Sequence, residues 1–383
     1  MIQFMQNKFF PEIKEKFGFG FMRLPLGPDK EVDDSMVCEM LDRFLEAGFN
    51  YVDTAHGYLG GASERGIRRC LTSRHSRDEY ILTDKLTQSF FNSREEIEPL
   101  LRSQLEICGV VYFDFYLMHA QKRGTYEHFM KCHAYEEAFR LKELGLVHHV
   151  GISFHDKASF LDEILTAWPQ IEVVQIQFNY ADYDDLGIES RKCYEVCVKH
   201  GKPVIVMEPV KGGFLANLPE YASKVFDRIG RTGSDASYAL RFAAQPENIM
   251  MVLSGMSTRE QVSENLALMK NPAKLNEAEM GAIAQINELL HRQDMVACTG
   301  CRYCVDGCPA GIPIPEIFAD MNSRKIYHDW NSSWYYTIHT EGKGLASECL
   351  KCGACESTCP QHLPIRELLV QAADVFETKR KHK

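Results

Sequence analysis

The architecture of this chain is first indicated by the run Phe49-Asn50-Tyr51-Val52-Asp53-Thr54-Ala55, in which aromatic and β-branched residues lead to an aspartate. A short run of this composition is typical of a buried strand with a polar tip. Eight such runs follow one another, and helical patterns separate them. The eight predicted strands span residues 17–25, 49–55, 80–86, 113–119, 148–154, 173–179, 203–209 and 249–256.

The helical patterns between these runs indicate how the strands are connected. Ser93, followed by Glu96, forms a capping box that is expected to begin a helix. Eight strand-then-helix units predict an α/β fold of the (β/α)₈ TIM-barrel type. A doubly wound open sheet is disfavoured, because no G-x-G-x-x-G motif opens the chain. The other expected barrel helices cover residues 35–47, 63–71, 126–144, 157–167, 188–200 and 258–269.

The pattern changes after the last of these helices, where prolines and cysteines replace the alternation of strands and helices. We expect a barrel domain over residues 1–275 and a small, mainly helical domain over residues 276–383. Helices are expected at residues 276–293, 315–324 and 364–377, with an aromatic stretch at residues 330–336.

Composition and charge exclude several classes of function. The formal net charge of −10 argues against a nucleic-acid-binding surface, which would need an excess of basic residues. No apolar run reaches about 18 residues, so no membrane span is expected. The N-terminus lacks the apolar core and cleavage site of a secretory signal, and the cytoplasm is the expected location.

Eight of the 14 cysteines follow residue 297, which indicates metal binding in a reducing compartment.

Those eight cysteines form two groups with the spacing C-x₂-C-x₂-C-x₃-C-P. The spacing is typical of 4Fe–4S ligation, in which three thiolates bind one cluster and the fourth binds the other cluster of a pair. Zinc is the alternative, but zinc sites favour two separated pairs of cysteines. The segments resemble the ferredoxin-type 4Fe–4S module. Two 4Fe–4S clusters are therefore expected, the first on Cys298, Cys301, Cys304 and Cys359 and the second on Cys349, Cys352, Cys355 and Cys308.

Titratable side chains lie at the tips of three consecutive predicted strands, at the end where a barrel carries its active site. Asp53 ends the second strand and Tyr58 lies in the loop just after it, Lys85 ends the third, and His119 ends the fourth. A nearby ammonium lowers the pKa of a tyrosine, and an aspartate holds the ammonium in place. Such a tyrosine can donate its proton to a carbonyl oxygen while hydride reaches the carbon. A histidine beside it can orient or polarise the carbonyl.

Four motifs of the barrel region resemble those of the aldo-keto reductase family. They are residues 49–55 with Tyr58, Ser63-Glu64-Arg65-Gly66, Thr83-Asp84-Lys85-Leu86 and Leu117-Met118-His119. The opening Gly18-Phe19-Gly20-Phe21-Met22-Arg23-Leu24-Pro25 is similar to the first strand of the family. The resemblance covers about residues 17–270. It implies that Asp53, Tyr58, Lys85 and His119 form a catalytic tetrad, with Tyr58 as the general acid.

A phosphate site is indicated after the eighth strand. Ser257 and Glu260 form a second capping box, and the free N–H groups with Arg259 could hold a phosphate. An ordinary helix cap has the same pattern. Gly212, in a Lys-Gly-Gly turn, could approach a pyrophosphate closely, although such a pair of glycines is often only a turn.

The family resemblance implies a nicotinamide cofactor, NADP(H) or NAD(H), with NADP(H) favoured by Arg259. It also implies adenine contacts from Glu264 and Asn265 and carboxamide contacts from Gln175 and Ser153. Three positions depart from the family pattern, namely residues 154–155, residues 207–209 and Gln261. The candidate cofactor-binding residues are Ser153, Gln175, Gly212, Ser257, Arg259, Glu264 and Asn265.

Three hypotheses of function remain open. The leading one is an NAD(P)H-linked oxidoreductase that reduces a small-molecule carbonyl, or oxidises an alcohol, and is coupled to two 4Fe–4S clusters. A hydride carrier moves two electrons and a cluster moves one, so a flavin, a redox partner protein or a substrate radical would have to divide the pair. The second hypothesis is a non-enzymatic electron carrier or redox sensor, and the third is a flavin-dependent reductase that uses the same barrel mouth. His56 and His155 lie near that mouth and are candidates for substrate contact.

Overall fold

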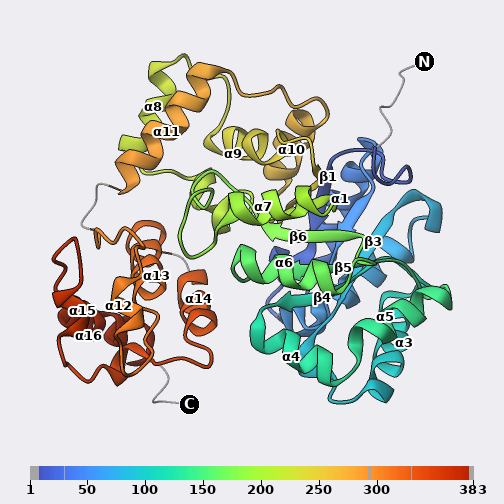
Figure 1. Cartoon of the computed structure of the whole chain (residues 1–383). Coiled ribbons are helices and arrows are strands. Elements are labelled where there is room, and N and C mark those ends of the chain that lie inside the picture. Colours follow the sequence, from blue (N-terminus) through green and yellow to red (C-terminus); the bar gives the residue numbers. More distant parts are fainter. Residues whose placement is uncertain (1–7, 30, 292–294, 329, 379–383) are drawn as a thin grey trace. The chain divides into compact units, whose positions relative to one another are not determined.

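The computed structural model describes residues 8–378, apart from residues 30, 292–294 and 329. Within this part of the chain, eight parallel strands form a closed barrel in which each strand pairs with the next and β8 pairs with β1 (Figure 1). The α/β barrel expected from the sequence is thereby confirmed. The strands are β1 (Phe17–Gly20), β2 (Tyr51–Asp53), β3 (Ile81–Leu86), β4 (Phe113–Gln121), β5 (Val147–Phe154), β6 (Val173–Gln177), β7 (Val204–Met207) and β8 (Ile249–Ser254).

Apolar side chains fill one end of the barrel. Tyr51 and Val173, the first residues of β2 and β6, belong to one buried cluster with Phe115 of β4. Phe10 and Ile13, which precede β1 in the chain, pack into the same cluster. Because the strand starts are sealed in this way, the C-terminal strand ends are left to carry polar residues, as is usual in such barrels.

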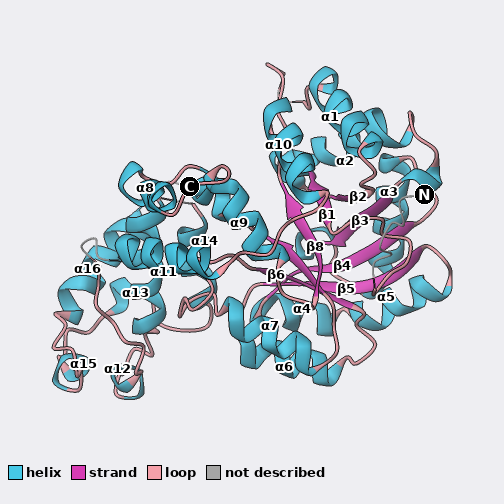
Figure 2. Ribbon diagram, turned by 90° about the horizontal axis from the view of Figure 1, so that it is seen from above, coloured by secondary structure: helices cyan, strands magenta, loops and turns pink. Residues whose placement is uncertain are grey.

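Helices surround the barrel and connect its strands (Figure 2). Longer helices such as those over residues 34–46 and 97–108 bury one apolar face, which is the pattern that predicted them. The helix over residues 235–244 was not among the expected helices. The helices of this part are α1 (Asp34–Glu46), α2 (Ala62–Ile67), α3 (Ile97–Cys108), α4 (Arg123–Lys131), α5 (Ala134–Glu143), α6 (Ala158–Ala167), α7 (Ser190–Lys199), α9 (Asp235–Ala244) and α10 (Arg259–Met269).

Two details of the expected helices are wrong. The single helix expected over residues 126–144 is split into α4 and α5, because His133 adopts a left-handed φ of 52° and interrupts the helix. Ser93 precedes a 3-10 turn over Arg94–Glu96 that leads into α3, but its side chain makes no capping hydrogen bond. Instead, the Glu96 carboxylate accepts a hydrogen bond from the backbone N–H of Asn92 at 2.7 Å, and α3 begins only at Ile97.

The chain divides into two compact units. The barrel unit consists of Met1–Tyr180, Ser190–Lys211 and Gly233–Asn276, and the second unit consists of Ala181–Glu189, Gly212–Thr232 and Glu277–Lys383. The described residues of the second unit form helices and loops without a strand (Figure 2). The helix expected over residues 276–293 is α11, and residues 292 and 293 lie outside the described part. The helices of this unit are α8 (Glu220–Arg228), α11 (Glu277–His291), α12 (Tyr303–Asp306), α13 (Ile314–Tyr327), α14 (Asn331–His339), α15 (Ala354–Ser357) and α16 (Ile365–Phe376).

A buried polar pair and stacked aromatic rings hold the second unit together. His339 Nδ1 of α14 lies 2.9 Å from Asp320 Oδ2 of α13, and His339 Nε2 lies 3.3 Å from the carbonyl oxygen of Gly187. The segment Ala181–Glu189, which follows a barrel strand in the chain, is therefore bonded to α14. The rings of Tyr336 and Phe376 stack with centroids 4.7 Å apart. Among the described residues, no helix has both the length and the apolar character needed to cross a membrane.

We predict that Gly151→Ala destabilises the barrel by about 1–3 kcal/mol, because the added methyl group overfills its interior. A Cβ at this position would lie 2.5 Å from Val173 Cγ1 and 2.7 Å from Leu117 Cδ2. Gly20→Ala is the matched control, since a Cβ there lies 3.5 Å or more from the neighbouring atoms. Urea unfolding followed by circular dichroism measures both variants. Equal unfolding midpoints would contradict the prediction.

Candidate functional site

Lys85 is the centre of a group of polar side chains at the C-terminal ends of β2, β3 and β4. Its side chain is fully buried, and Nζ donates hydrogen bonds to Asp53 Oδ1 at 2.7 Å and to the Thr54 carbonyl oxygen at 2.6 Å. A buried ammonium is costly unless it is paired and hydrogen-bonded. These two contacts therefore fix the charge of Lys85 at one place.

Tyr58 lies against the same ammonium. Lys85 Nζ is 5.0 Å from the centre of the Tyr58 ring, close enough for its charge to act on the phenol. Gly57 adopts a left-handed φ of 92°, which glycine reaches without strain, and this turn follows β2. The imidazole of His119 lies 5.7 Å from the Tyr58 ring, edge to face. The structure thus brings together the four side chains that the sequence placed on separate strand tips.

Burial and charge together set the protonation of this group. Burial lowers the pKa of Lys85, but Asp53 and Tyr58 outweigh it, so the pKa is raised and the ammonium persists at neutral pH. Burial raises the pKa of Tyr58 while the Lys85 charge opposes the rise, so the phenol keeps its proton. Burial, with repulsion from Lys85, lowers the pKa of His119 well below its usual range, which leaves a neutral imidazole.

Two neighbouring side chains hold members of this group. Thr87 Oγ1 lies 2.8 Å from His119 Nδ1, and Gln175 Nε2 donates to Asp53 Oδ2 at 3.3 Å. Burial raises the pKa of the Asp53 carboxyl, and its contacts with Lys85 and Gln175 oppose that rise. Sequence reasoning gave Thr87 no role. The available signal was its place two residues after Lys85, which puts both side chains on the same face of the chain as it leaves β3.

The candidate nicotinamide contacts occupy neighbouring strands. Ser153 of β5 is paired in register with Gln175 of β6, and both are buried. Ser153 Oγ lies 3.5 Å from His155 Nε2. The candidate adenine contacts lie on α10 instead. Asn265 is buried and donates a hydrogen bond to Ser254 Oγ at 3.4 Å, whereas Glu264 is exposed.

The cap of α10 differs from the expected one. Thr258, rather than Ser257, is the N-cap residue, and its side chain accepts a hydrogen bond from the Gln261 N–H at 3.2 Å. The Ser257 hydroxyl donates to the Arg23 carbonyl oxygen at 2.6 Å, and the Ser257 N–H donates to Gln261 Oε1 at 2.7 Å. The expected box is thus shifted by one residue, because Ser257 is used to tie the loop to the segment that follows β1.

Two further cofactor candidates have surroundings that the sequence did not reveal. Arg259 Nε donates to Glu39 Oε2 of α1 at 2.5 Å, so its guanidinium already has a carboxylate partner. Gly212 belongs to the second unit and adopts a left-handed φ of 64°. Glu208, which follows β7, accepts a hydrogen bond from Arg23 Nη2 at 2.9 Å. A charged pair therefore joins the segments that follow β1 and β7.

The eight clustered cysteines line two hollows of similar size, each of about 330 Å³. Ile314 lines both hollows. The four thiols of each hollow come from both cysteine groups, and thiolates in fours are the ligands that 4Fe–4S clusters take. The donor set of each hollow therefore fits such a cluster. The first hollow contains Cys298, Cys301, Cys304 and Cys359, and the second contains Cys308, Cys349, Cys352 and Cys355.

The closed (β/α)₈ barrel carries this polar group at the C-terminal ends of its strands, where barrel enzymes have their active sites. The model of the aldo/keto reductase family matches residues 16–288, and the chain belongs to that family. The model of the 4Fe–4S dicluster domain matches residues 297–363. The protein is thus an aldo-keto reductase-type oxidoreductase with a ferredoxin-like iron–sulfur domain.

Solved structures share the barrel fold at low sequence identity. The chain superposes on aldo-keto reductase AKR11C1 from Bacillus halodurans with a TM-score of 0.58 and 22% identity, covering 71% of this chain and 91% of that one. It superposes on an aldo-keto reductase from Klebsiella pneumoniae, solved in complex with NADPH, with a TM-score of 0.56 and 18% identity, covering 72% and 90%. These likenesses concern the fold.

Among curated proteins, norsolorinic acid reductase of Aspergillus flavus is 40% identical over 60 residues. The match spans 16% of this chain and 16% of that enzyme. The similarity is therefore local and covers about a sixth of the relative.

We predict that the two hollows are separate ligand sets with crossed membership. Cys359→Ala is expected to alter the same electron paramagnetic resonance signal as Cys301→Ala, because both thiols line the first hollow. Cys308→Ala is expected to alter the other signal together with Cys352→Ala. Each variant should lose about four irons per chain.

The control for this experiment is Cys193→Ala, a buried helix cysteine that lines neither hollow. It should keep both signals. If Cys359→Ala instead changed the signal that Cys352→Ala changes, the crossed arrangement would be refuted.

Proposed function

We propose that the barrel catalyses NAD(P)H-linked reduction of a small-molecule carbonyl, or the reverse oxidation of an alcohol, with Asp53, Tyr58, Lys85 and His119 as the catalytic residues. The observation that carries this proposal is the buried Lys85 ammonium, which is bonded to Asp53 and lies 5.0 Å from the centre of the Tyr58 ring. Such an ammonium stabilises the phenolate that remains after Tyr58 gives up its proton. Membership in the aldo/keto reductase family supports the same reaction class.

The chemical roles follow from the charges of the site. When bound, the nicotinamide supplies a hydride to the carbonyl carbon. Tyr58 donates its proton to the carbonyl oxygen, and the Lys85 charge stabilises the phenolate that forms. The neutral His119 donates a hydrogen bond to the same oxygen if Thr87 fixes its Nδ1 as the acceptor. Asp53 keeps Lys85 in place and accepts a hydrogen bond from Gln175.

Cofactor binding is proposed for the residues implied by the family resemblance. Ser153 and Gln175 lie on paired strands next to Asp53 and suit contacts to a carboxamide. NADP(H) is favoured over NAD(H) by Arg259, which would have to leave Glu39 or bind a phosphate beside it. An aldo-keto reductase of the same fold from Klebsiella pneumoniae is solved in complex with NADPH, which supports a nicotinamide cofactor here. Flavin use would need a different set of contacts and stays an alternative.

We further propose that the two hollows each hold one 4Fe–4S cluster and that these clusters pass electrons to a redox partner protein. A cluster accepts one electron at a time, whereas hydride transfer moves two, so a partner or a flavin would have to join the two processes. All 14 cysteines are free of disulfides, which suits a reducing compartment such as the cytoplasm.

Tyr58→Phe is expected to lower kcat for carbonyl reduction by about 10²–10⁴-fold, because the ring remains but the acid is lost. Cluster absorbance and iron content should be unchanged. Oxidation of NADPH with a panel of aldehydes and ketones, under anaerobic conditions, measures the effect. Full activity in Tyr58→Phe would contradict the proposed acid, and an inactive native protein with no cofactor binding would contradict the reaction class.

The pH dependence of reduction gives a second test. Since burial and Lys85 lower the pKa of His119 well below 6.5, the imidazole is already neutral throughout the neutral range. The rate of reduction is therefore expected to show no step near pH 6.5 on the acid side. Steady-state rates between about pH 5.5 and 8 check this. A step near the ordinary pKa of histidine that disappears in His119→Gln would mean that this imidazole titrates normally.

A further inference from the structure

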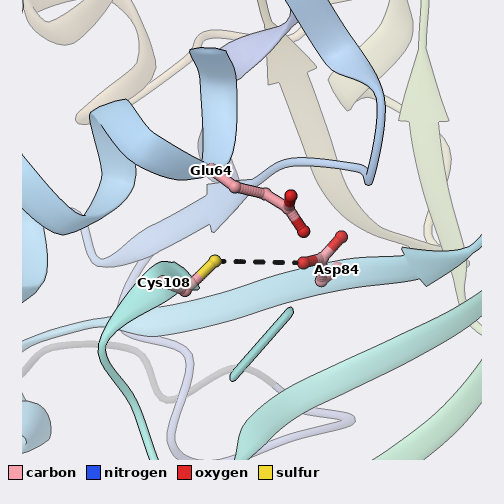
Figure 3. Close-up of side chains that lie close together, drawn as sticks. All are labelled: Glu64, Asp84 and Cys108. Atoms are coloured by element: carbon pink, nitrogen blue, oxygen red, sulfur yellow. Dashed lines mark hydrogen bonds between the residues drawn. The ribbon is translucent and has the colours of Figure 1, made fainter. Parts of the chain in front are cut away.

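A second group of buried titratable side chains includes Asp84, the neighbour of Lys85 in the chain, and has no part in the proposed reaction. Glu64 of α2, Asp84 of β3 and Cys108 of α3 each offer an oxygen or sulfur atom, and these atoms lie within 4.8 Å of one another (Figure 3). Their exposed fractions are 1%, 0% and 0%. Two carboxyl groups without access to water would repel each other strongly if both were ionised.

The hydrogen bonds of this group leave one buried carboxylate oxygen, Glu64 Oε1, without a donor in the described part of the chain. Asp84 Oδ1 accepts from the Lys85 backbone N–H at 2.7 Å, and the Cys108 thiol lies 4.0 Å from Asp84 Oδ2. Glu64 Oε2 lies 2.8 Å from His56 Nδ1. Glu64 Oε1 is buried and has no hydrogen-bond donor within the described part of the chain. A buried acceptor without a donor is costly, and a proton on the neighbouring carboxyl would supply one.

The surroundings of Asp84 and Glu64 also favour a proton on this pair of carboxyl groups. The Lys85 ammonium is bonded to Asp53 and the Thr54 carbonyl oxygen. The other titratable groups near the pair are the Cys108 thiol of α3, the Tyr116 phenol of β4, His56 and the Tyr58 phenol. Burial, followed by the nearby Glu64 carboxyl, raises the pKa of Asp84 well above its usual range.

We propose that Asp84 and Glu64 share one proton, and that the hydrogen-bonded chain Asp84–Glu64–His56 positions the loop that carries Tyr58. Asp84 donates the proton to Glu64, and Glu64 accepts a hydrogen bond from His56 through its second oxygen. The pair then carries one negative charge in place of two beside the catalytic ammonium.

The link to catalysis runs through His56. His56 precedes Tyr58 by two residues, and its ring lies edge-on against Phe90 with centroids 4.3 Å apart. A Cβ on Gly57 would come within 3.2 Å of the same Phe90 ring, so the loop is closely packed there. Glu64 and Phe90 thus hold the imidazole from two sides. Glu64, Asp84 and His56 are positioning residues, because they act through the Tyr58 loop.

A divalent metal ion is the competing occupant of this group. One sulfur and two carboxylate oxygens resemble a zinc donor set, but a metal would require the thiol and both carboxyls to be ionised in a buried place. The shared proton satisfies the open acceptor of Glu64 without that charge. The two accounts differ in the behaviour of Asp84→Asn, whose amide can donate to Glu64 but is a poor metal ligand.

The positioning role rests on the proposed carbonyl reduction and is tested by kinetics. Glu64→Ala is expected to lower kcat by about 10–100-fold, with KM changed by less than about threefold, because the acid is displaced while the substrate site remains. Glu64→Gln, which can still bond His56 and Asp84, should recover most of kcat. If Glu64→Ala raised KM and left kcat intact, or if Glu64→Gln were as impaired as Glu64→Ala, the positioning role would be wrong.

The shared proton is tested without any enzyme assay. An unfolded aspartate ionises near pH 3.9, whereas Asp84 in the folded protein keeps its proton, so the native protein loses stability as the pH rises above about 4. The amide introduced by Asp84→Asn does not titrate. The melting temperature of this variant, relative to the native protein, is therefore expected to rise between about pH 4 and pH 8. A difference that stays constant across this range would overturn the proposal.

Infrared difference spectra between the native protein and Asp84→Asn give the direct test. At neutral pH the native protein should show the C=O stretch of a protonated carboxyl group, shifted in D₂O and absent in Asp84→Asn. Cys108→Ser is the matched control and should keep the band. Absence of the band in the native protein, or a stoichiometric zinc or manganese ion that Asp84→Asn loses, would overturn the shared proton and would leave the proposed carbonyl reduction untouched.

Discussion

The ion pair between Lys85 and Asp53 is the constraint on which the barrel site depends. Both side chains are buried and lie 2.7 Å apart, so neither charge is compensated by water. Removing one partner of such a pair usually destabilises a protein by about 3–5 kcal/mol, since the other charge stays buried. The pair therefore adds little stability, and its presence is explained by its effect on Tyr58. Burial raises the pKa of the Tyr58 phenol, and the ammonium opposes that rise.

The residues that can be predicted from sequence are those whose position depends on short-range pattern. The strand runs, the polar tips that follow them and the cysteine spacings each repeat a local rule, and the barrel and the meeting of Asp53, Tyr58, Lys85 and His119 followed from them. The four thiols of each hollow also match the crossed sets expected from spacing. The roles of these residues as catalysts and ligands stay predictions for experiment.

Features that depend on distant partners were not predictable. The sequence pattern leaves the Arg259 side chain available to bind a phosphate. In the fold, however, Arg259 donates a hydrogen bond to Glu39, which is far from Arg259 in the chain. The N-cap of α10 moved to Thr258 because Ser257 is bonded to Arg23. The break between α4 and α5 arises because His133 adopts a left-handed conformation, and no glycine at this position marks it in the sequence. Segments such as Ala181–Glu189 join the second unit through contacts with residues more than a hundred positions away.

The central claim is that hydride arrives at a carbon whose oxygen takes the Tyr58 proton. The most direct measurement uses NADPH that carries deuterium at the transferring position of the nicotinamide, together with a ketone substrate under anaerobic conditions. Direct transfer within the barrel predicts one deuterium on the new carbinol carbon, with a single stereochemistry. Product formed without deuterium, in the presence of a bound flavin or reduced clusters, would show that the electrons travel by another route and would contradict the account.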